Sequence, residues 1–349
     1  FTLGTALFSL VAAVYLFTVV PKGFFPTEDT GLLFAVTQGS PDISFEAISR
    51  LQQQAAKIVE NDPAVAVVNS STGSSGFSIT GNTGRLFIGL KPLHERDADI
   101  IQVQQRLRAK LAGIPGLRVF IQPVQNINVG ARPSASQYQY TLQSGDFDEL
   151  QRVEAQMEER IRALPGVLDV TSDLQLNNPE LFVDIDRQKA AALNVTVEQV
   201  RNTLYSAFGA RKVASINTSS NSYDVILELS PQFRRDPNAL SQIYVRGSGG
   251  QLVSLSAVAS VHRTSGPQTV NHQSGTPAAT ISFNLAPGVS LGEAVQRIQE
   301  AERELNLPPT VTTGFQGTAQ VFKESLQGQG LLLLGAIYVI YVVLGVLYE

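Results

Sequence analysis

The chain has 349 residues, a net charge of −4 and no cysteine. The acidic balance, with no window rich in lysine and arginine, argues against nucleic-acid binding, because phosphate neutralisation needs a basic surface. The absence of cysteine excludes disulfides, thiolate metal sites and a cysteine nucleophile. One methionine and three scattered histidines leave little for soft-metal binding. At this length we expect roughly two or three domains.

Two uncharged apolar stretches bracket the chain, Phe1–Val20 and Leu331–Leu347. Each is close to the ~20 residues that a helix needs to cross ~30 Å of hydrocarbon. We therefore expect transmembrane helices over 1–20 and 328–349, around one large extramembrane segment. Neither stretch carries an acidic residue, a lysine, an arginine or a histidine, so residues that couple transport to an ion gradient would lie elsewhere.

A cleaved signal peptide is the alternative interpretation of the first stretch. Two features favour a span: no basic residue precedes the stretch, and Pro21–Pro26 is not a small-residue cleavage site. The chain begins with Phe1, and Glu349 directly follows an apolar stretch. We therefore expect this sequence to be a piece of a longer polypeptide.

Residues 21–135 have the pattern of one small α+β unit. Apolar residues recur at helical spacing over 45–59 and 100–111. Strands are predicted where β-branched and apolar residues cluster, at 32–38, 64–69, 85–90 and 117–121. The order strand–helix–strand–strand–helix–strand is that of a ferredoxin-like unit.

The same order begins again after residue 135. A strand at 138–142 precedes a helix with a capping-box-like start at Asp146 and Glu149, which Pro165-Gly166 ends. Further strands are predicted at 167–171, 181–185, 279–285 and 311–315, with a helix capped by Ser290 before the last of them. Similar Pro-x-Val turns after the first helix of each unit support an internal duplication.

The second unit is interrupted by an insertion. We assign 136–181 and 271–322 to the ferredoxin-like unit and 182–270 to the insertion. The insertion has its own predicted helix near 196–204, and its strands are expected at 223–229, 243–245 and 251–255. The turn residues Arg246–Gly250 suit a hairpin.

Catalytic and cofactor motifs are absent from the sequence, which predicts that the chain is not an enzyme and needs no cofactor or metal. The glycine-rich run 73–84 joins two strands and lacks a phosphate-binding lysine. It is either a flexible hairpin loop or a mobile flap that carries Phe77 and Ile79. Asp184 and Asp186 share a strand face, where paired carboxylates could bind a metal. Their position before a helix favours an N-cap.

A set of short stretches, taken in order, resembles the resistance–nodulation–division (RND) exporters. They are Pro21–Gly31, Asn82–Gly84, Leu90–Pro92, Val183–Arg187, Leu285–Gly288, Gly317–Gln320 and Leu344–Glu349. The resemblance covers the whole chain and is greatest to the multidrug, or hydrophobe/amphiphile, branch, especially to subunits of the MdtB/MdtC type.

This resemblance implies the second periplasmic loop of a proton-driven drug exporter of the bacterial inner membrane, with flanking spans similar to the seventh and eighth helices. The two ferredoxin-like units resemble porter subdomains, and the insertion resembles a docking subdomain. Expected partners are amphiphilic small molecules, like subunits in a homo- or heterotrimer, a periplasmic adaptor protein, an outer-membrane channel and the lipid bilayer. The proton-relay residues would lie outside this chain.

The resemblance also implies binding residues. A switch loop would contain Gly73, Gly76, Phe77, Ile79 and Gly81, and a deep pocket would contain Phe77 and Phe87. An outer cleft would be lined by Val36, Gln38, Ser172, Gln175, Thr280 and Ser282. Phe87 lies in a strand, where core packing is the alternative role. An aromatic residue expected near Ala66 and an arginine expected near Ser172 are missing.

Three other functions stay open at this point. A metal exporter of the same superfamily is disfavoured by the scarcity of methionine, cysteine and clustered histidine. A two-span receptor with an extracytoplasmic sensing domain would not explain a duplicated ferredoxin-like unit. A membrane-anchored enzyme is disfavoured by the missing catalytic motifs.

Overall fold

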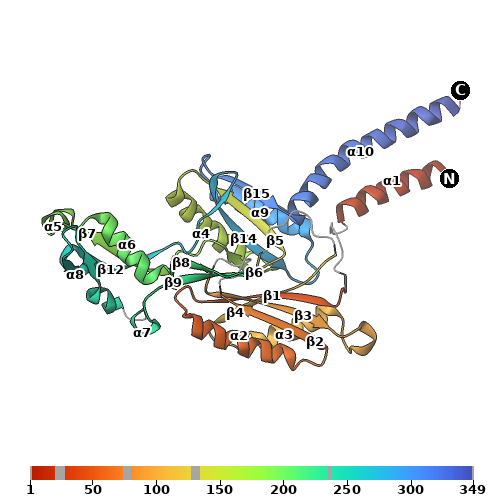
Figure 1. Ribbon diagram of the computed structural model, residues 1–349. Helices are drawn as coiled ribbons and strands as arrows, with labels where there is room; N and C mark the ends of the chain where they lie inside the picture. Colours follow the sequence, from red (N-terminus) through yellow and green to blue (C-terminus); the bar gives the residue numbers. More distant parts are fainter. Residues whose placement is uncertain (1, 20–27, 74–79, 127–133, 235–236, 348–349) are drawn as a thin grey trace. The chain divides into compact units, whose positions relative to one another are not determined.

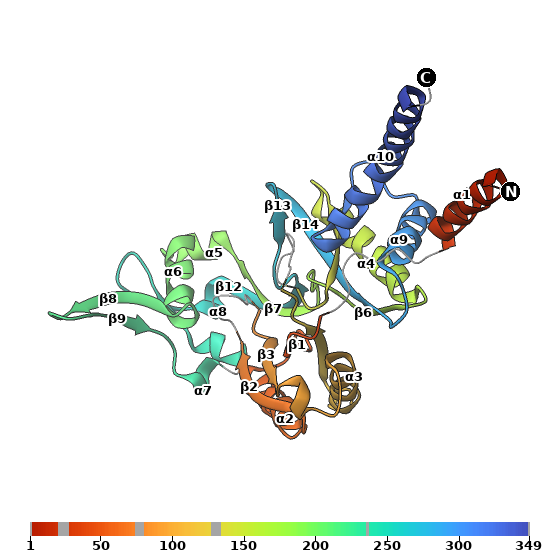
Figure 2. The same ribbon diagram turned by 90° about the vertical axis from the view of Figure 1, so that its right-hand side faces the viewer.

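The structure is a computed structural model that describes residues 2–19, 28–73, 80–126, 134–234 and 237–347. The chain divides into two compact units. The larger unit consists of 1–177 and 267–349, and the smaller unit is 178–266. Figures 1 and 2 show the elements from two directions.

The first half of the larger unit is a four-stranded antiparallel sheet in the order β2-β3-β1-β4. Helices α2 and α3 cover one face of it (Figure 1). The elements are β1 (Leu32–Gly39), α2 (Phe45–Glu60), β2 (Val65–Thr72), β3 (Thr83–Leu90), the 3-10 turn η1 (Leu93–Glu95), α3 (Ile100–Leu111) and β4 (Leu117–Pro123). This order and pairing are those of a ferredoxin-like unit, as the sequence predicts.

Side-chain periodicity builds the core of this unit. Alternation along β1 buries Leu33 and Ala35 against the helices. The α3 helix buries Ile100, Val103 and Leu107, which recur at helical spacing on one face. These residues belong to one cluster of buried side chains between the sheet and its two helices. No helix among the described residues covers the opposite face of this sheet, and this face provides part of the site described below.

The second half of the larger unit repeats the arrangement with the strand order β6-β14-β5-β15, and the short strand β13 also pairs with β14. Its elements are β5 (Tyr138–Gln143), α4 (Phe147–Ala163), β6 (Val167–Ser172), β13 (Asn271–Gln273), β14 (Thr276–Leu285), α9 (Leu291–Leu305) and β15 (Thr312–Gln316). The predicted caps form: Asp146 accepts from the amides of Asp148 and Glu149, and Ser290 accepts from that of Glu293.

One predicted strand belongs elsewhere. The predicted strand order counts 181–185 as a strand of the second ferredoxin-like unit, although the assigned bounds put 182–185 in the insertion. These residues lie in β7 (Asn178–Ile185), which pairs with β12 (Ala259–Gly266) inside the smaller unit. The third strand of the repeat is β14, almost a hundred residues later in the chain. Local pattern marks both segments as strands, and only long-range pairing decides which sheet each one joins.

The smaller unit, 178–266, starts and ends a few residues before the predicted insertion. Its other elements are α5 (Arg187–Ala192), α6 (Val197–Phe208), β8 (Arg211–Asn217), β9 (Ser222–Leu227), α7 (Pro231–Arg234), η2 (Pro237–Gln242), β10 (Tyr244–Arg246), β11 (Leu252–Ser254) and α8 (Leu255–Val258). Val200, Val245 and Val258 are central to a small core. The exposed β8–β9 hairpin, whose first strand the sequence analysis missed, projects from this unit (Figure 2). Asp186 caps α5, the role that the sequence favours.

Helices also form at both ends of the chain, α1 (Thr2–Val19) and α10 (Thr318–Leu347). Among the residues that the structure describes, no helix meets the combined requirement of length and hydropathy for crossing a membrane. The transmembrane helices expected over 1–20 and 328–349 stay a prediction.

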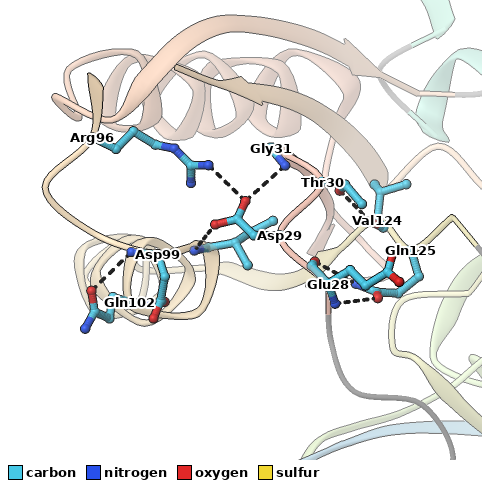
Figure 3. A network of polar contacts seen from close by, with 10 residues as sticks. Glu28, Asp29, Thr30, Gly31, Arg96, Asp99, Gln102, Val124 and Gln125 are labelled. Carbon is cyan, nitrogen blue, oxygen red and sulfur yellow. Dashed lines mark hydrogen bonds and ion pairs between the residues drawn. The ribbon is translucent and has the colours of Figure 1, made fainter. Parts of the chain in front are cut away.

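A polar network fixes the start of β1 to α3 and β4 (Figure 3). The Asp29 carboxylate accepts hydrogen bonds from the Arg96 guanidinium at 2.9 Å, the Gly31 amide at 3.1 Å and the Ile100 amide at 3.0 Å. Burial acts to raise the pKa of Asp29, but these donors outweigh it and hold the pKa below its usual value. Thr30 donates to a carbonyl just past β4 at 2.7 Å. The segment that enters the sheet is therefore held on both sides.

Candidate functional site

An outer cavity lies where the two ferredoxin-like units meet. Its volume is about 380 Å³, and β1 and β3 of the first unit and β5, β6 and β14 of the second contribute to its walls. All the residues predicted for the outer cleft lie on this lining: Val36, Gln38, Ser172, Gln175, Thr280 and Ser282. The structure thus brings these residues together, and their role in binding a ligand stays a prediction.

Strand alternation explains why these side chains face the cavity. In β1, Leu33 and Ala35 are buried under the helices, so Phe34 and Val36 point to the opposite face. In β14, Ile281 and its neighbours of the same parity enter the core, which turns Thr280 and Ser282 to the cavity side. The lining therefore combines apolar, hydroxyl and amide groups from two sheets.

Polar contacts join the two halves around this cavity. The Asn82 side-chain amide donates to the Gln175 side chain at 2.7 Å, and the Thr171 hydroxyl donates to Gln38 at 3.3 Å. An ion pair between Arg108 of α3 and Asp169 of β6 adds a 2.6 Å contact. Gln38, Thr171 and Gln175 also line the cavity, so these hydrogen bonds hold part of its wall in place.

An inner cavity of about 560 Å³ lies against the open face of the first sheet. Phe87 of β3 lines it and is 53% exposed, and Val67 beside it is 63% exposed. The ring of Phe34 lies 5.1 Å from that of Phe87, centroid to centroid. Phe87 is therefore not part of the hydrophobic core, which was the alternative left open by the sequence. It presents an aromatic surface to the cavity.

The two cavities adjoin, because three residues line both of them: Phe34, Ser134 and Gln139. The outer cavity is lined mainly by hydroxyl and amide side chains, whereas the inner one contains Leu32, Phe87 and Val124. A path from one to the other would pass the Phe34 ring. An amphiphilic molecule could place its apolar part in the inner cavity and its polar part in the outer one.

Most of the predicted switch loop, including Gly76, Phe77 and Ile79, lies outside the described residues. Its flanks are described. The Gly73 amide donates to the Thr83 carbonyl at 2.9 Å, which closes the base of the loop. Thr80 and Thr83 line the outer cavity, so the loop leaves the sheet beside that cavity. The loop's role stays a prediction.

Two acidic residues at this site were missed by the sequence analysis, Asp173 and Glu154. Asp173 lines the outer cavity, and its carboxylate accepts from the Thr280 amide at 2.6 Å and the Asn271 side chain at 2.8 Å. Burial raises the pKa of Asp173 despite these hydrogen bonds. Its position after a strand gives no signal of this environment.

Glu154 lies on the buried face of α4 and is only 3% exposed. Burial raises its pKa to about 7, with further contributions from the charges of Glu158 and Asp173. A hydrogen bond from Ser172 and the charge of Arg162 oppose this rise. Within the described part of the chain, the Oε1 atom of Glu154 has no hydrogen-bond partner. A buried acid with such a pKa is the kind of group that functional sites use.

The first unit holds an amide where the second holds this acid. Gln52 lies seven residues after Phe45, which begins α2, and Glu154 lies seven residues after Phe147, which begins α4. The amide is 1% exposed and well paired. It donates to the Ser70 hydroxyl at 3.1 Å and to the Arg85 carbonyl at 3.0 Å, and it accepts from Thr37. The available sequence signal was a glutamate within the buried stripe of a helix. That one of its carboxylate oxygens, Oε1, lacks a hydrogen-bond partner among the described residues is visible only in the fold.

No group of metal-ligating side chains large enough to hold an ion occurs among the described residues.

The family of this chain follows from its sequence as a whole, which matches the AcrB/AcrD/AcrF family over residues 1–349. The chain belongs to this family. The resemblance to RND exporters inferred from the sequence is therefore confirmed.

Individual relatives agree with this assignment. The multidrug resistance protein MdtC of Cronobacter sakazakii is 41% identical over 347 residues, which cover 99% of this chain and 33% of that protein. The chain thus spans about a third of the length of this curated relative.

Solved structures show the same fold. A heavy metal efflux pump in crystal form I matches with a TM-score of 0.83 and 21% identity over 98% of this chain and 36% of that one. Crystal form II matches with a TM-score of 0.78 and 20% identity, over 95% of this chain and 35% of that one. The predicted α+β fold with ferredoxin-like units is confirmed.

Proposed function

We propose that this chain is the periplasmic substrate-binding and docking portion of a proton-driven multidrug transporter of the bacterial inner membrane. The observation that carries the proposal is the pair of adjoining cavities, one aromatic and apolar and one polar, that share the Phe34 ring. Large sites with aromatic walls and few fixed polar anchors suit promiscuous binding of amphiphilic molecules. The multidrug name of the 41% identical relative supports the same class of substrate.

In this proposal, Phe87 and Phe77 bind the apolar part of the drug in the inner cavity. The six outer-cleft residues, from Val36 to Ser282, receive the drug first. The loop over 73–81 opens and closes the passage between the two sites. Each subunit then passes in turn through three conformers, and this cycle carries the drug outward. Protonation of residues outside this chain shifts the populations of these conformers.

Assembly is part of the same proposal. Like subunits would form a homo- or heterotrimer, and the 178–266 unit would face a periplasmic adaptor and an outer-membrane channel. Its exposed β8–β9 hairpin supports a docking role, because Ile216, Tyr223 and Ile226 leave apolar surface uncovered. Crosslinking from introduced cysteines at these positions would trap the adaptor, the channel or a like subunit, whereas the absence of any crosslink in the assembled complex would contradict docking.

Drug accumulation in cells tests the binding role. The full-length protein should lower accumulation, and Phe87→Ala or Phe77→Ala should restore it at matched expression. Leu93→Ala is the matched control, because Leu93 is an equally exposed apolar residue that lines neither cavity. If the full-length protein lowers accumulation and both phenylalanine variants match it, the proposed pocket is wrong. If the full-length protein has no effect with adaptor and channel present, the export function is wrong.

A further inference from the structure

The outer cavity contains a carboxylate whose hydrogen-bond donors are both neutral. Asp173 receives the Thr280 amide on one oxygen and the Asn271 amide on the other. These donors orient the carboxylate but bring no full positive charge to it. A partly buried carboxylate in this state is stabilised by a cation placed in the cavity beside it.

A second acid lies behind the wall. The Ser172 hydroxyl donates to Glu154, its oxygen accepts the Leu174 amide at 3.0 Å, and Ser172 itself lines the cavity. Ser172 therefore separates the buried acid from the cavity, and Asp173 is the next residue in the chain. The charge of each carboxylate disfavours ionisation of the other.

The comparison with the first unit indicates that the acid is not needed for folding. Gln52 occupies the matching helix position and pairs with Ser70, as Glu154 pairs with Ser172. Ser70 lies five residues after the start of β2, and Ser172 lies five residues after the start of β6. A neutral amide satisfies this architecture, so the acid calls for a separate explanation.

We propose that Asp173 contacts the cationic group of an amphiphilic ligand in the outer cavity. Glu154, acting through Ser172 and through its charge, makes the affinity for this ligand depend on pH, because protons and the cation compete for the two carboxylates. The inference rests on the proposed function and names its ligand class as singly cationic amphiphiles. Asp173 is the specificity-determining residue, and Glu154 is a positioning residue.

The remaining lining fits such a ligand. Phe34 and Val36 provide apolar surface for the body of the molecule, and an aromatic ring also attracts a cation. Arg85 of β3 lines the same cavity and carries the opposite charge to Asp173. Its charge works against a second cationic group, which is why one positive charge is expected on the ligand.

The competition between protons and the ligand fixes the direction in which affinity changes with pH. Cation binding favours the ionised form of both acids, so it releases protons, and affinity should rise with pH through the region where Glu154 titrates. The groups that act on Glu154 from its own helix are Glu158 and Arg162. On the neighbouring elements, the titratable or charged groups are Asp169 in β6, Asp173 just after β6, Tyr140 of β5 and the Glu293–Arg297 pair of α9. Arg160, also on α4, pairs with Glu304 of α9. Asp169 is paired with Arg108, and burial raises the pKa of Tyr140 far above its usual range, so Tyr140 stays neutral.

The test is dye binding to the purified full-length protein, followed by fluorescence polarisation with rhodamine 6G, which is cationic, and Nile red, which is uncharged. Titrations would run from about pH 5.5 to about pH 8.5, on both sides of the Glu154 pKa. We expect rhodamine affinity to rise across this range and Nile red affinity to stay constant. Asp173→Asn should weaken rhodamine binding roughly tenfold at the upper pH, the size typical of one partly buried charged contact, and leave Nile red unchanged.

Glu154→Gln should flatten the pH profile of rhodamine binding. Glu159→Gln is the matched control, since Glu159 is on the same helix but exposed, and it should leave the profile as it is. Unchanged Nile red binding in each variant shows that the cavity is intact. The inference is overturned if Asp173→Asn weakens both dyes equally or neither, or if Glu154→Gln keeps the pH profile. If neither dye binds the unmodified protein, the proposed function itself is wrong.

Discussion

The two ferredoxin-like units share one scaffold and differ in the chemistry they bury. Both have the strand order of a split βαβ fold, and both pack an amphipathic helix that begins with phenylalanine, at Phe45 and at Phe147. On the matching turn of these helices the first unit holds a fully paired amide, Gln52, and the second holds an acid, Glu154, whose Oε1 atom has no hydrogen-bond partner among the described residues. The two units therefore share the positions that build the core and differ in this buried polar side chain.

The same divergence affects the third strand of each unit. In β3, Phe87 faces a cavity and Ile88 enters the core, whereas in β14 the cavity-facing residue is Ser282 and the aromatic residue, Phe283, is completely buried. The first unit thus offers an apolar surface to ligands and the second a polar one. Four predictions test this contrast.

The largest effect is expected from the two phenylalanines. Phe283→Ala should lower the free energy of unfolding by about 3–5 kcal/mol, because it leaves a cavity in a packed core. Phe87→Ala should lower it by less than about 1 kcal/mol, because the ring is half exposed. Hydrogen exchange of the β14 and β3 amides measures both values. A comparable loss in the two variants would mean that Phe87 belongs to the core.

Exchanging the acid and the amide should sharpen the contrast. Gln52→Glu should destabilise the first unit by about 3 kcal/mol near neutral pH, because a carboxylate oxygen would replace the group that donates to the Arg85 carbonyl. Hydrogen exchange of α2 is the measurement. Gln53→Glu, on the exposed side of the same helix, is the control and should have little effect. Equal losses in the two variants would show that burial is not the cause.

The reverse change, Glu154→Gln, should stabilise the second unit by about 2 kcal/mol above pH 7. Burial raises the pKa of Glu154 in the folded protein to about 7 from its ordinary value of 4.5, so the folded protein binds the proton more tightly than the unfolded chain. The unmodified protein therefore loses stability as pH rises from 4.5 to about 7, and the variant should not. Hydrogen exchange of α4 at several pH values checks this, and a gain that is independent of pH would contradict it.

The smallest effects concern the caps of the matching helices. Ser44→Ala and Asp146→Ala should each cost about 1 kcal/mol of local stability, because each removes an acceptor for backbone amides at a helix start. Asp146 accepts from two amides and Ser44 from one, so its loss should be the greater. Exchange rates in the first turns of α2 and α4 provide the measurement. A greater loss at Ser44 would contradict the ranking.

The regular elements of both units could be predicted because their signals are local. Helical spacing of apolar residues marked α2, α3 and α4, and capping residues marked where α4 and α9 begin. The segment 181–185 was recognised as a strand but placed in the wrong sheet, because strand propensity contains no information on the partner. The β8 strand was missed, since its charged start and its isolation from any core give a weak pattern.

The outer-cleft residues were predicted from the family resemblance, and the structure shows them on the lining of one cavity. Side chains of β1 and β14 face this cavity because successive residues of a strand point to opposite faces of the sheet. Asp173 and Glu154 could not be selected from the sequence. A glutamate in an amphipathic helix is usually solvated, and the cost of burying this one depends on the strands that surround it.

By itself, the sequence determined the repeated α+β architecture and family membership, because these follow from local periodicity and from motifs in order. Only the tertiary structure decided which strands pair, that Phe87 faces a cavity while Phe283 is buried, and that Glu154 has a pKa near neutrality. The physical reason is that desolvation and cavity shape arise from residues far apart in the chain, whose packing no local pattern specifies.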